Sequence, residues 1–166
     1  MSAMITRSGI GYDVHRLEAG RPLVLGGVKL FHPQGLGLAG HSDADVLCHA
    51  IADAILGAAG LQDIGHYFPN ADASLRGISS LEILRRTAGI IADAGARIIN
   101  VDSTLIAEEP KISPHVSTMR ERIAESLGLD SSRIGVKATT NEMLGFLGRG
   151  EGIAALATAS VETPAE

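Results

Sequence analysis

The spacing of apolar residues changes along the chain, and each change marks the boundary of a predicted element. Alternating or β-branched stretches indicate strands, whereas apolar residues three or four positions apart indicate helices. The predicted strands cover residues 5–17, 23–30, 97–107, 134–140 and 153–162. The second of these stretches has Gly26-Gly27 at its centre, which predicts a tight hairpin turn.

The same pattern predicts three helices, over residues 43 to about 57, 79–94 and 113–127. Ser42 or Asp43 is expected to cap the first helix. Ser79, with Glu82 three residues later, predicts a capping box at the start of the second. Gly128 is expected to end the third helix. Residues 35–40 are interpreted as a mobile approach to the first helix, and residues 62–77 as a loop.

This order of strands and helices predicts an α/β (α+β) two-layer sandwich, in which helices pack on one face of a mixed β-sheet. A chain of 166 residues fits one domain, spanning residues 1–166, and can bury roughly two-thirds of its unfolded surface. The tail, residues 163–166, is expected to be disordered.

Composition limits both the core and the partners of this domain. Hydrophobic residues make up 45% of the chain but aromatic residues only 3%, so the core must consist mainly of Ala, Ile, Leu and Val. The formal charge of −5 argues against a nucleic-acid partner, because binding phosphates along a backbone requires a basic patch. An anionic small substrate would need metal ions or local cations instead.

The single cysteine, Cys48, excludes an internal disulfide and is expected to be a small core residue. The sequence has no apolar run of about 18 residues and no signal-like segment. We therefore expect a soluble, cytoplasmic protein without a membrane partner.

Three side chains of metal-ligand type are predicted to converge. Asp13 and His15 are two residues apart on a predicted strand, so they project from the same face, about 6.6 Å apart. His49 comes from the first helix, where it is expected to share a face with Asp45. Two imidazoles and one carboxylate leave a tetrahedral zinc ion one ligand short, as in catalytic sites. The alternative is an ordinary polar strand with a hydrogen-bonded histidine.

Four further segments carry polar side chains that could meet a ligand. Asp63, His66, Asn70 and Asp72 lie in one predicted loop, which is either solvent-facing or occupied by a ligand. Residues 107–113 and 137–142 each lie at the end of a predicted strand, where free backbone groups, Lys111 and hydroxyls could hold an anion or a hard cation. Residues 145–152 could be a flexible turn, although Phe146 and Arg149 form an unusual exposed pairing there. Each segment also has a purely structural interpretation.

Many short motifs match one known family in order and spacing. They are Asp13-Val14-His15, residues 41–46, His49-Ala50, Asp53-Ala54, residues 56–58, Asp63-Ile64-Gly65, Phe68-Pro69, Pro110-Lys111, Pro114-His115, residues 137–140, Glu142, residues 144–146 and residues 148–153. From about residue 6 to about residue 162, the chain resembles the 2-C-methyl-D-erythritol 2,4-cyclodiphosphate synthases of the non-mevalonate isoprenoid pathway.

The resemblance implies a lyase that cyclises 4-diphosphocytidyl-2-C-methyl-D-erythritol 2-phosphate and releases cytidine monophosphate (CMP). It implies one Zn²⁺ per subunit on Asp13, His15 and His49, and Mg²⁺ or Mn²⁺ on Glu142. His41 and Thr140 would be catalytic hydrogen-bond donors. A homotrimer is implied, with active sites between subunits and a central cavity near Phe146 and Arg149 that can accept an isoprenoid diphosphate.

The resemblance also implies a set of residues that bind the substrate. They are Asp13, His15, His41, Ser42, Asp63, Ile64, Gly65, Phe68, Asn70 and Asp72 around the metal and the erythritol phosphate, Ala107, Lys111, Ile112, Ser113, Ala138, Thr139, Thr140, Asn141 and Glu142 around the cytidine diphosphate, and Phe146 and Arg149. The chain departs from the family pattern at Gln62, Asn70, Asn141 and Met143.

Two other functions remain open from sequence. One is a zinc phosphohydrolase, which would use the same open metal to activate water and would release inorganic phosphate. The other is a non-enzymatic trimer that senses isoprenoid diphosphates through Phe146 and Arg149.

Overall fold

The structure is a computed structural model that describes residues 3–165. A five-stranded mixed sheet forms its centre, with the strand order β4-β1-β7-β5-β6. The strands are β1 (Met4–Ala19), β4 (Leu36–Leu38), β5 (Arg97–Ile106), β6 (Ile134–Thr139) and β7 (Gly152–Pro164). Strands β5 and β6 are parallel, and the other neighbours are antiparallel. The predicted mixed sheet is confirmed.

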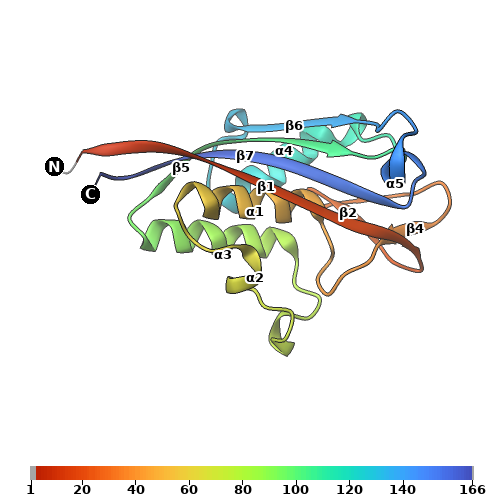
Figure 1. Cartoon of the computed structure of the whole chain (residues 1–166), viewed down its shortest axis with the longest axis horizontal. Helices are drawn as coiled ribbons and strands as arrows, with labels where there is room; N and C mark the ends of the chain where they lie inside the picture. Colours follow the sequence, from red (N-terminus) through yellow and green to blue (C-terminus); the bar gives the residue numbers. More distant parts are fainter. Residues whose placement is uncertain (1–2, 166) are drawn as a thin grey trace.

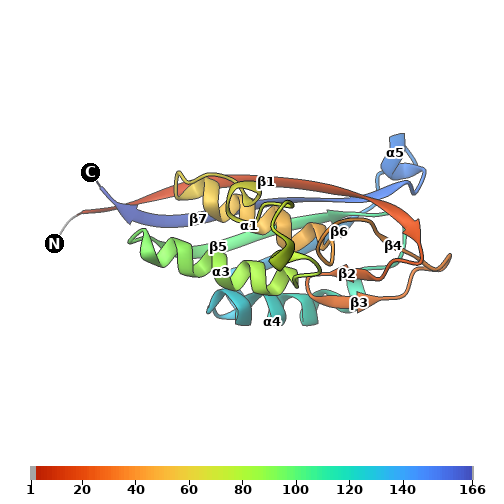
Figure 2. The ribbon, with the colours of Figure 1, turned by 90° about the horizontal axis from the view of Figure 1, so that it is seen from below.

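Three long helices pack against this sheet (Figures 1 and 2). They are α1 (Val46–Ala58), α3 (Ser80–Asp93) and α4 (Val116–Leu127). Helix α1 lies against β1 and β7, and α3 lies between α1 and α4. The buried residues of α1 are almost all aliphatic, and Cys48 is fully buried among them as predicted. No helix within residues 3–165 is both long enough and apolar enough to span a bilayer.

The opposite face of the sheet is exposed and carries large apolar side chains. On β1, Gly11 and Asp13 face α1, so by alternation Ile10, Tyr12 and Val14 face away from it. Leu156 of β7 pairs in register with Tyr12 and adds to the same surface. Ile10 is 72% exposed and Tyr12 is 52% exposed. An apolar surface of this kind on a sheet is typical of a protein contact.

The predicted hairpin forms as β2 (Leu23–Leu25) and β3 (Val28–Leu30), and Gly26 and Gly27 occupy the left-handed region with φ of 57° and 72°. Two predicted irregular segments contain regular structure. Strand β4 lies in the approach to α1, while α2 (Ile64–Tyr67) and the 3₁₀ helix η1 (Ala73–Leu75) lie in the loop after α1. These elements have three or four residues, which is too short to give a periodic signal.

The remaining short elements are η2 (Ser113–His115), η3 (Ser131–Arg133) and α5 (Gly145–Gly148). The third predicted helix therefore begins with a 3₁₀ turn, and it ends at Gly128 in the left-handed conformation as predicted. The prediction of a disordered tail is wrong for Thr163 and Pro164, which belong to β7, and for Ala165, which donates a hydrogen bond to Ala3. Glu166 lies outside the described residues.

Two helix caps also differ from the prediction. The N-cap of α1 is Asp45, rather than Ser42 or Asp43. The capping box at Ser79 does not form, because the Ser79 side chain makes no cap hydrogen bond and Glu82 pairs with Arg85 and Arg86.

Candidate metal centre and active-site cleft

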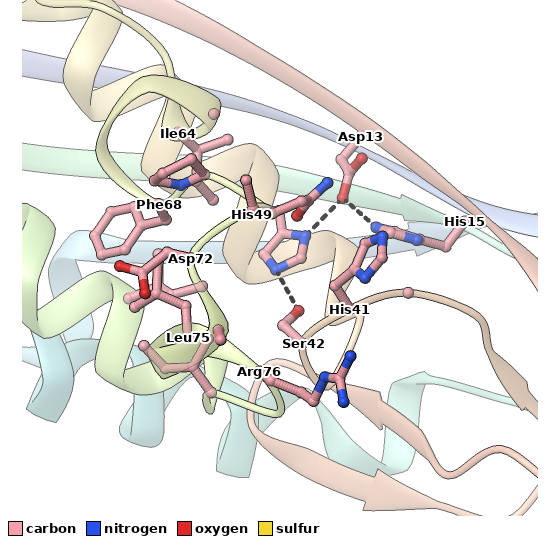
Figure 3. Close-up of a pocket in the computed structure, with 18 residues that line it drawn as sticks. Asp13, His15, His41, Ser42, His49, Ile64, Phe68, Asp72, Leu75 and Arg76 are labelled. Atoms are coloured by element: carbon pink, nitrogen blue, oxygen red, sulfur yellow. Dashed lines mark hydrogen bonds and ion pairs between the residues drawn. The ribbon is translucent and has the colours of Figure 1, made fainter.

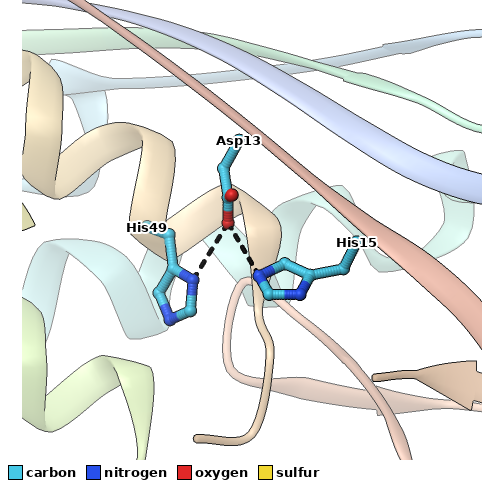
Figure 4. A group of neighbouring side chains, drawn as sticks. All are labelled: Asp13, His15 and His49. Atoms are coloured by element: carbon cyan, nitrogen blue, oxygen red, sulfur yellow. Dashed lines mark hydrogen bonds and ion pairs between the residues drawn. The ribbon is translucent and has the colours of Figure 1, made fainter. Parts of the chain in front are cut away.

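Asp13, His15 and His49 meet between β1 and α1 (Figure 4). Asp13 Oδ2 lies 3.1 Å from His15 Nε2 and 3.0 Å from His49 Nδ1. One ligand atom from each residue lies within 4.8 Å of the others. Within residues 3–165, this is the one group of three acidic, histidine or cysteine side chains close enough to share an ion.

Local structure explains why these side chains converge. Asp13 and His15 project from the same face of β1, and His49 lies in the first turn of α1. Strand and helix approach closely because β1 has glycine where they touch. A Cβ atom on Gly11 would lie 1.9 Å from the carbonyl oxygen of Ala50. Because Gly11 has no side chain, α1 can pack close enough to β1 for His49 to reach the same carboxylate as His15.

The backbone orients the ring of His15. His15 Nδ1 lies 2.6 Å from the carbonyl oxygen of Ala39, which can only accept a hydrogen bond. A hydrogen therefore lies on Nδ1, and Nε2 faces Asp13. A histidine held by a carbonyl in this way is a common arrangement at metal sites.

The electrostatics of this cluster favour ionised groups. Burial alone would raise the pKa of Asp13, but hydrogen bonds and charge from His15 and His49 outweigh it and hold this pKa well below its usual range. Burial opposes the charge on His15, but hydrogen bonding and charge from Asp13 raise the pKa of His15 overall. Asp13 is therefore a carboxylate throughout the neutral range. One carboxylate and two imidazoles form a donor set that suits zinc and similar divalent ions.

The cluster lies at one end of a cleft of about 420 Å³ (Figure 3). Ile64, Phe68 and Asp72 lie toward the other end, on the segment between α1 and α3. The predicted substrate-binding residues that line this cleft are Asp13, His15, His41, Ser42, Ile64, Gly65, Phe68, Asn70 and Asp72. It combines apolar walls with a few polar groups, as is typical of a small-molecule site.

Asp63 does not line the cleft. Its carboxylate accepts the backbone N–H of His66 at 3.0 Å and caps α2. Asp72 caps η1, accepting both the N–H and the hydroxyl of Ser74, but it also reaches the cleft. These two aspartates therefore have structural roles that spacing in the sequence could not distinguish from ligand binding.

A second group of predicted residues gathers away from this cleft, where β5 and β6 end. The N–H of Ala107 donates to the carbonyl of Thr139, and the N–H of Asn141 donates to Glu108 Oε1 at 2.8 Å. The group comprises Ala107, Lys111, Ile112, Ser113, Ala138, Thr139, Thr140, Asn141 and Glu142. Within one chain, these residues do not contribute to the cleft.

Solvent exposure determines which atoms of this second group a ligand could contact. Ala107 and Ile112 are buried, so only their backbone groups are available to a ligand. Lys111, Thr140 and Glu142 are exposed. Glu142 is also held in the left-handed region, with φ of 52°. Non-glycine residues in that region cost conformational energy and are concentrated at functional sites.

Phe146 lies on α5 and is 43% exposed, as the sequence suggested. Arg149 is not a free cation, because its Nε lies 2.6 Å from Glu151 Oε1. Both side chains are exposed, as the sequence suggested, and a ligand for them stays a prediction. Glu151 is two residues away in the sequence and could have been considered.

Asp45 does not lie on the metal-facing side of α1, and the prediction that it shares a face with His49 is wrong. It is fully buried and accepts N–H groups from Gly26 at 2.9 Å, Gly27 at 2.8 Å and Cys48 at 3.2 Å. Burial raises the pKa of this carboxyl group. Asp45 therefore fastens the β2–β3 hairpin to the start of α1.

Sequence reasoning missed three residues of this region. Arg76 lines the cleft beside the labelled acidic and apolar residues (Figure 3), where a cation could meet a phosphate. Asp43 and Ser80 hold the far side of His49. Nothing in the sequence around Arg76, apart from its charge, indicates a place in a ligand site. The contact between Asp43 and Ser80 joins residues 37 positions apart, so local spacing could not predict it.

Comparisons with known proteins identify the family of this chain. The model of the YgbB family matches residues 6–162. The 2-C-methyl-D-erythritol 2,4-cyclodiphosphate synthase of Akkermansia muciniphila is 56% identical over 99% of this chain and 96% of the relative.

Two solved structures show the same fold. The bifunctional IspDF of Campylobacter jejuni has a TM-score of 0.91 and 43% identity, covering 97% of this chain and 43% of that longer chain. The CDP complex of IspF from Plasmodium falciparum has a TM-score of 0.81 and 35% identity, covering 97% of both chains.

Proposed function

Since this chain belongs to the YgbB family and matches its cyclodiphosphate synthases over nearly their full length, we propose that its cleft is one half of a metal-dependent active site. The chain is a phosphorus–oxygen lyase of the non-mevalonate pathway. It converts 4-diphosphocytidyl-2-C-methyl-D-erythritol 2-phosphate to 2-C-methyl-D-erythritol 2,4-cyclodiphosphate and CMP. The observation that carries the proposed site is the meeting of Asp13, His15 and His49 at the end of the cleft.

The nucleophile of this reaction belongs to the substrate. An oxygen of the 2-phosphate forms a bond to the β-phosphorus, and the bond from that phosphorus to the bridging oxygen breaks. The electron pair leaves with the α-phosphate of CMP. The protein therefore needs no covalent nucleophile, and its tasks are to fold the substrate, neutralise its charge and align the attack.

Asp13, His15 and His49 are the residues that would hold a divalent ion, which we propose is Zn²⁺, one per subunit. When bound, such an ion supplies a Lewis acid toward a phosphate oxygen. His41 and Ser42 line the cleft beside these ligands, where they can donate hydrogen bonds to a phosphate. His41 is the catalytic donor that we propose from this chain.

The other end of the cleft is proposed to hold the methylerythritol phosphate. Ile64 and Phe68 supply apolar surface for the carbon skeleton, and Asn70 supplies a neutral amide. Asp72 carries a negative charge, so a phosphate there requires a cation nearby. Arg76 lines the same cleft and is suited to this task. Asp63 would act through its cap on α2 and through the backbone of Gly65.

The second group of residues, at the ends of β5 and β6, is proposed to bind the cytidine diphosphate from a neighbouring subunit. Exposed hydroxyls, Lys111 and free backbone groups suit a nucleoside diphosphate. Thr140 would be the catalytic donor on this side. Glu142 would hold Mg²⁺ or Mn²⁺, a cation that neutralises charge on a diphosphate when bound. The relative from Plasmodium falciparum was solved with CDP, which supports a ligand of this class.

We propose that three copies assemble through the exposed face of the sheet. The apolar surface formed by Ile10, Tyr12, Val14 and Leu156 supports a contact there. Because the cleft and the nucleotide-binding group are separate within one chain, a neighbouring copy is needed to complete each active site. Phe146 and Arg149 would line a central cavity for an isoprenoid diphosphate, and Arg149 would exchange Glu151 for the ligand.

Product identification tests the reaction directly. Protein loaded with zinc and magnesium is incubated with the diphosphocytidyl substrate, and the products are followed by ³¹P NMR. Equal amounts of CMP and cyclic diphosphate are expected. Inorganic phosphate as the product would indicate the phosphohydrolase. Binding of an isoprenoid diphosphate without any turnover would indicate a sensor.

The same assay tests the role of Glu142. Glu142→Gln removes the charge that would hold the second cation, so turnover should fall by about a hundredfold while zinc content is unchanged. High magnesium should restore part of the activity. Glu125→Gln is the matched control, because Glu125 is an exposed residue of α4 outside both predicted groups. Equal turnover of the two variants at limiting magnesium would remove Glu142 from the proposed site.

A further inference from the structure

His49 has two ring nitrogens with different surroundings. Nδ1 faces Asp13 and the metal position, at 3.0 Å from Oδ2. Nε2 points away from that position and lies 2.9 Å from Ser80 Oγ and 3.2 Å from Ser42 Oγ. The ring can coordinate an ion through Nδ1 only in the form that carries its hydrogen on Nε2.

Ser80 is fully buried at the start of α3 and is held by Asp43 through two contacts. The backbone N–H of Ser80 donates to Asp43 Oδ2 at 2.9 Å, and the hydroxyl of Ser80 donates to Asp43 Oδ1. Asp43 therefore caps α3 from 37 positions earlier in the chain. The same segment is fixed by the N–H of Gly77, which donates to the carbonyl of His41 at 3.0 Å.

The direction of these hydrogen bonds follows from donor and acceptor chemistry. A carboxylate can only accept, so the hydroxyl hydrogen of Ser80 is committed to Asp43. The oxygen of Ser80 is then left as an acceptor toward His49, and Nε2 must carry the hydrogen between them. Ser42 is the weaker partner, because it is farther away and its oxygen already accepts the N–H of Ala44 at 3.0 Å.

We infer that Asp43 and Ser80 are positioning residues for the proposed metal site, fixing both the orientation of His49 and the tautomer that presents Nδ1 to the ion. This inference rests on the proposed metal-dependent function. Hydrogen-bond partners of this kind at ligating histidines typically change metal affinity by about ten- to a hundredfold. The chain Asp43–Ser80–His49 also links the first turn of α1 to the first turn of α3.

Zinc affinity of the full-length protein tests the inference, measured by competition with a chromophoric chelator. Ser80→Ala removes the acceptor and should weaken zinc binding by about ten- to a hundredfold. Ser79→Ala is the matched control, because the neighbouring Ser79 is exposed and makes no cap hydrogen bond. Ser80→Thr keeps the hydroxyl and should restore most of the affinity. Thermal unfolding of the metal-free variants shows whether each one is folded.

Asp43→Asn tests the direction of the hydrogen bonds that run from His49 through Ser80 to Asp43. The N–H of Ser80 needs an oxygen at the position of Oδ2, so the amide introduced by this substitution must direct its N–H₂ group toward Ser80 Oγ. Ser80 then donates to His49 rather than accepting from it, which favours the wrong tautomer. We expect Asp43→Asn to weaken zinc binding at least as much as Ser80→Ala.

Nitrogen chemical shifts of the His49 ring provide a readout other than affinity. In zinc-loaded wild-type protein, Nε2 should carry hydrogen and Nδ1 should show the shift of a metal ligand. Zinc on Nε2, or equal affinity of wild type and Ser80→Ala, would overturn the inference while leaving the metal site intact. A wild-type protein that binds no zinc would overturn the metal site and the inference together.

Discussion

At the scale of single residues, Asp13 holds the metal-binding cluster together. It contacts both histidines, and its own charge is maintained by them. In the metal-free protein this arrangement has a consequence for stability, because the pKa values of Asp13 and His15 move in opposite directions when the chain folds.

We predict that the Asp13–His15 pair stabilises the metal-free protein most between about pH 4 and pH 6.5. The pKa of His15 is raised above 6.5, so its contribution is complete below that pH and is lost as the pH rises through the raised value. The pKa of Asp13 is lowered from 3.8, so its contribution is lost as the pH falls below that value.

Denaturant unfolding across this range, in the presence of a chelator, measures the effect. His15→Ala is the control and should lose the part of the pH dependence that lies above pH 6.5. An unfolding midpoint of wild type that rises relative to His15→Ala above pH 6.5 would contradict the prediction.

Thr87 is a second residue with a testable energetic effect. It is fully buried in α3, and its hydroxyl has no hydrogen-bond partner among the described residues. A buried hydroxyl without a partner costs about 1–3 kcal/mol, and valine has nearly the same shape. Thr87→Val should therefore stabilise the protein by about 1 kcal/mol, or roughly 2–4 °C in Tm.

Calorimetry of Thr87→Val and Thr118→Val separates the effect of removing a buried hydroxyl from a general effect of valine in a helix. Thr118 is exposed on α4, so Thr118→Val should not raise the Tm. A lower Tm for Thr87→Val would mean that the hydroxyl has a partner that stabilises the fold.

Sequence alone could identify the metal-type ligands, because strand geometry places Asp13 and His15 together and helical spacing makes His49 available. It could not assign Asp45 or Ser79. Asp45 has three backbone donors, of which two are 18 and 19 residues away, and burial by distant segments is not encoded in local spacing. Ser79 has the local sequence pattern of a helix cap, but the N–H of Ser80 at the start of α3 is capped by Asp43 from another loop.

At the scale of elements, the contact between β1 and α1 sets the distance between His49 and the two ligands on the strand. Gly11→Ala would place a Cβ atom 1.9 Å from the carbonyl of Ala50, next to His49. The clash can be relieved only if β1 or α1 moves as a whole. We therefore expect the free energy of unfolding to fall by about 1–3 kcal/mol and zinc binding to weaken.

Gly89→Ala is the matched control for this prediction. Gly89 is exposed within α3, and a Cβ atom there meets nothing within 4 Å. Alanine should stabilise that helix by up to about 1 kcal/mol and leave zinc affinity unchanged. Unchanged zinc affinity in a folded Gly11→Ala protein would show that the site tolerates a wider separation of strand and helix.

The elements that sequence predicted well are those with local signals. The hairpin turn needs two left-handed residues, and Gly26-Gly27 provides them. The order of strands in the sheet was not predictable in this way, because β1 pairs with β7 and β5 pairs with both β7 and β6 through contacts between distant segments. The prediction of a mixed sheet covered by helices needed only the succession of elements.

At the scale of the whole molecule, we predict a trimer in solution. Light scattering should give a mass of about three times the 17.2 kDa of one chain. Tyr12→Glu places a charge within the exposed apolar face of the sheet and should dissociate the trimer with loss of activity. Thr118→Glu places the same charge on α4 and should leave the mass unchanged. A wild-type monomer with full activity would contradict both the assembly and the shared active site.

The pairing of β1 with β7 also governs when the site can form during protein synthesis. Residues 4–16 of β1 find all their partners in that ladder among residues 152–164 of β7. A ribosome adding about 5–20 residues per second makes those partners on the order of ten seconds after β1. Until then, the strand that carries Asp13 and His15 has no neighbour along this edge. Metal insertion is therefore expected to follow translation.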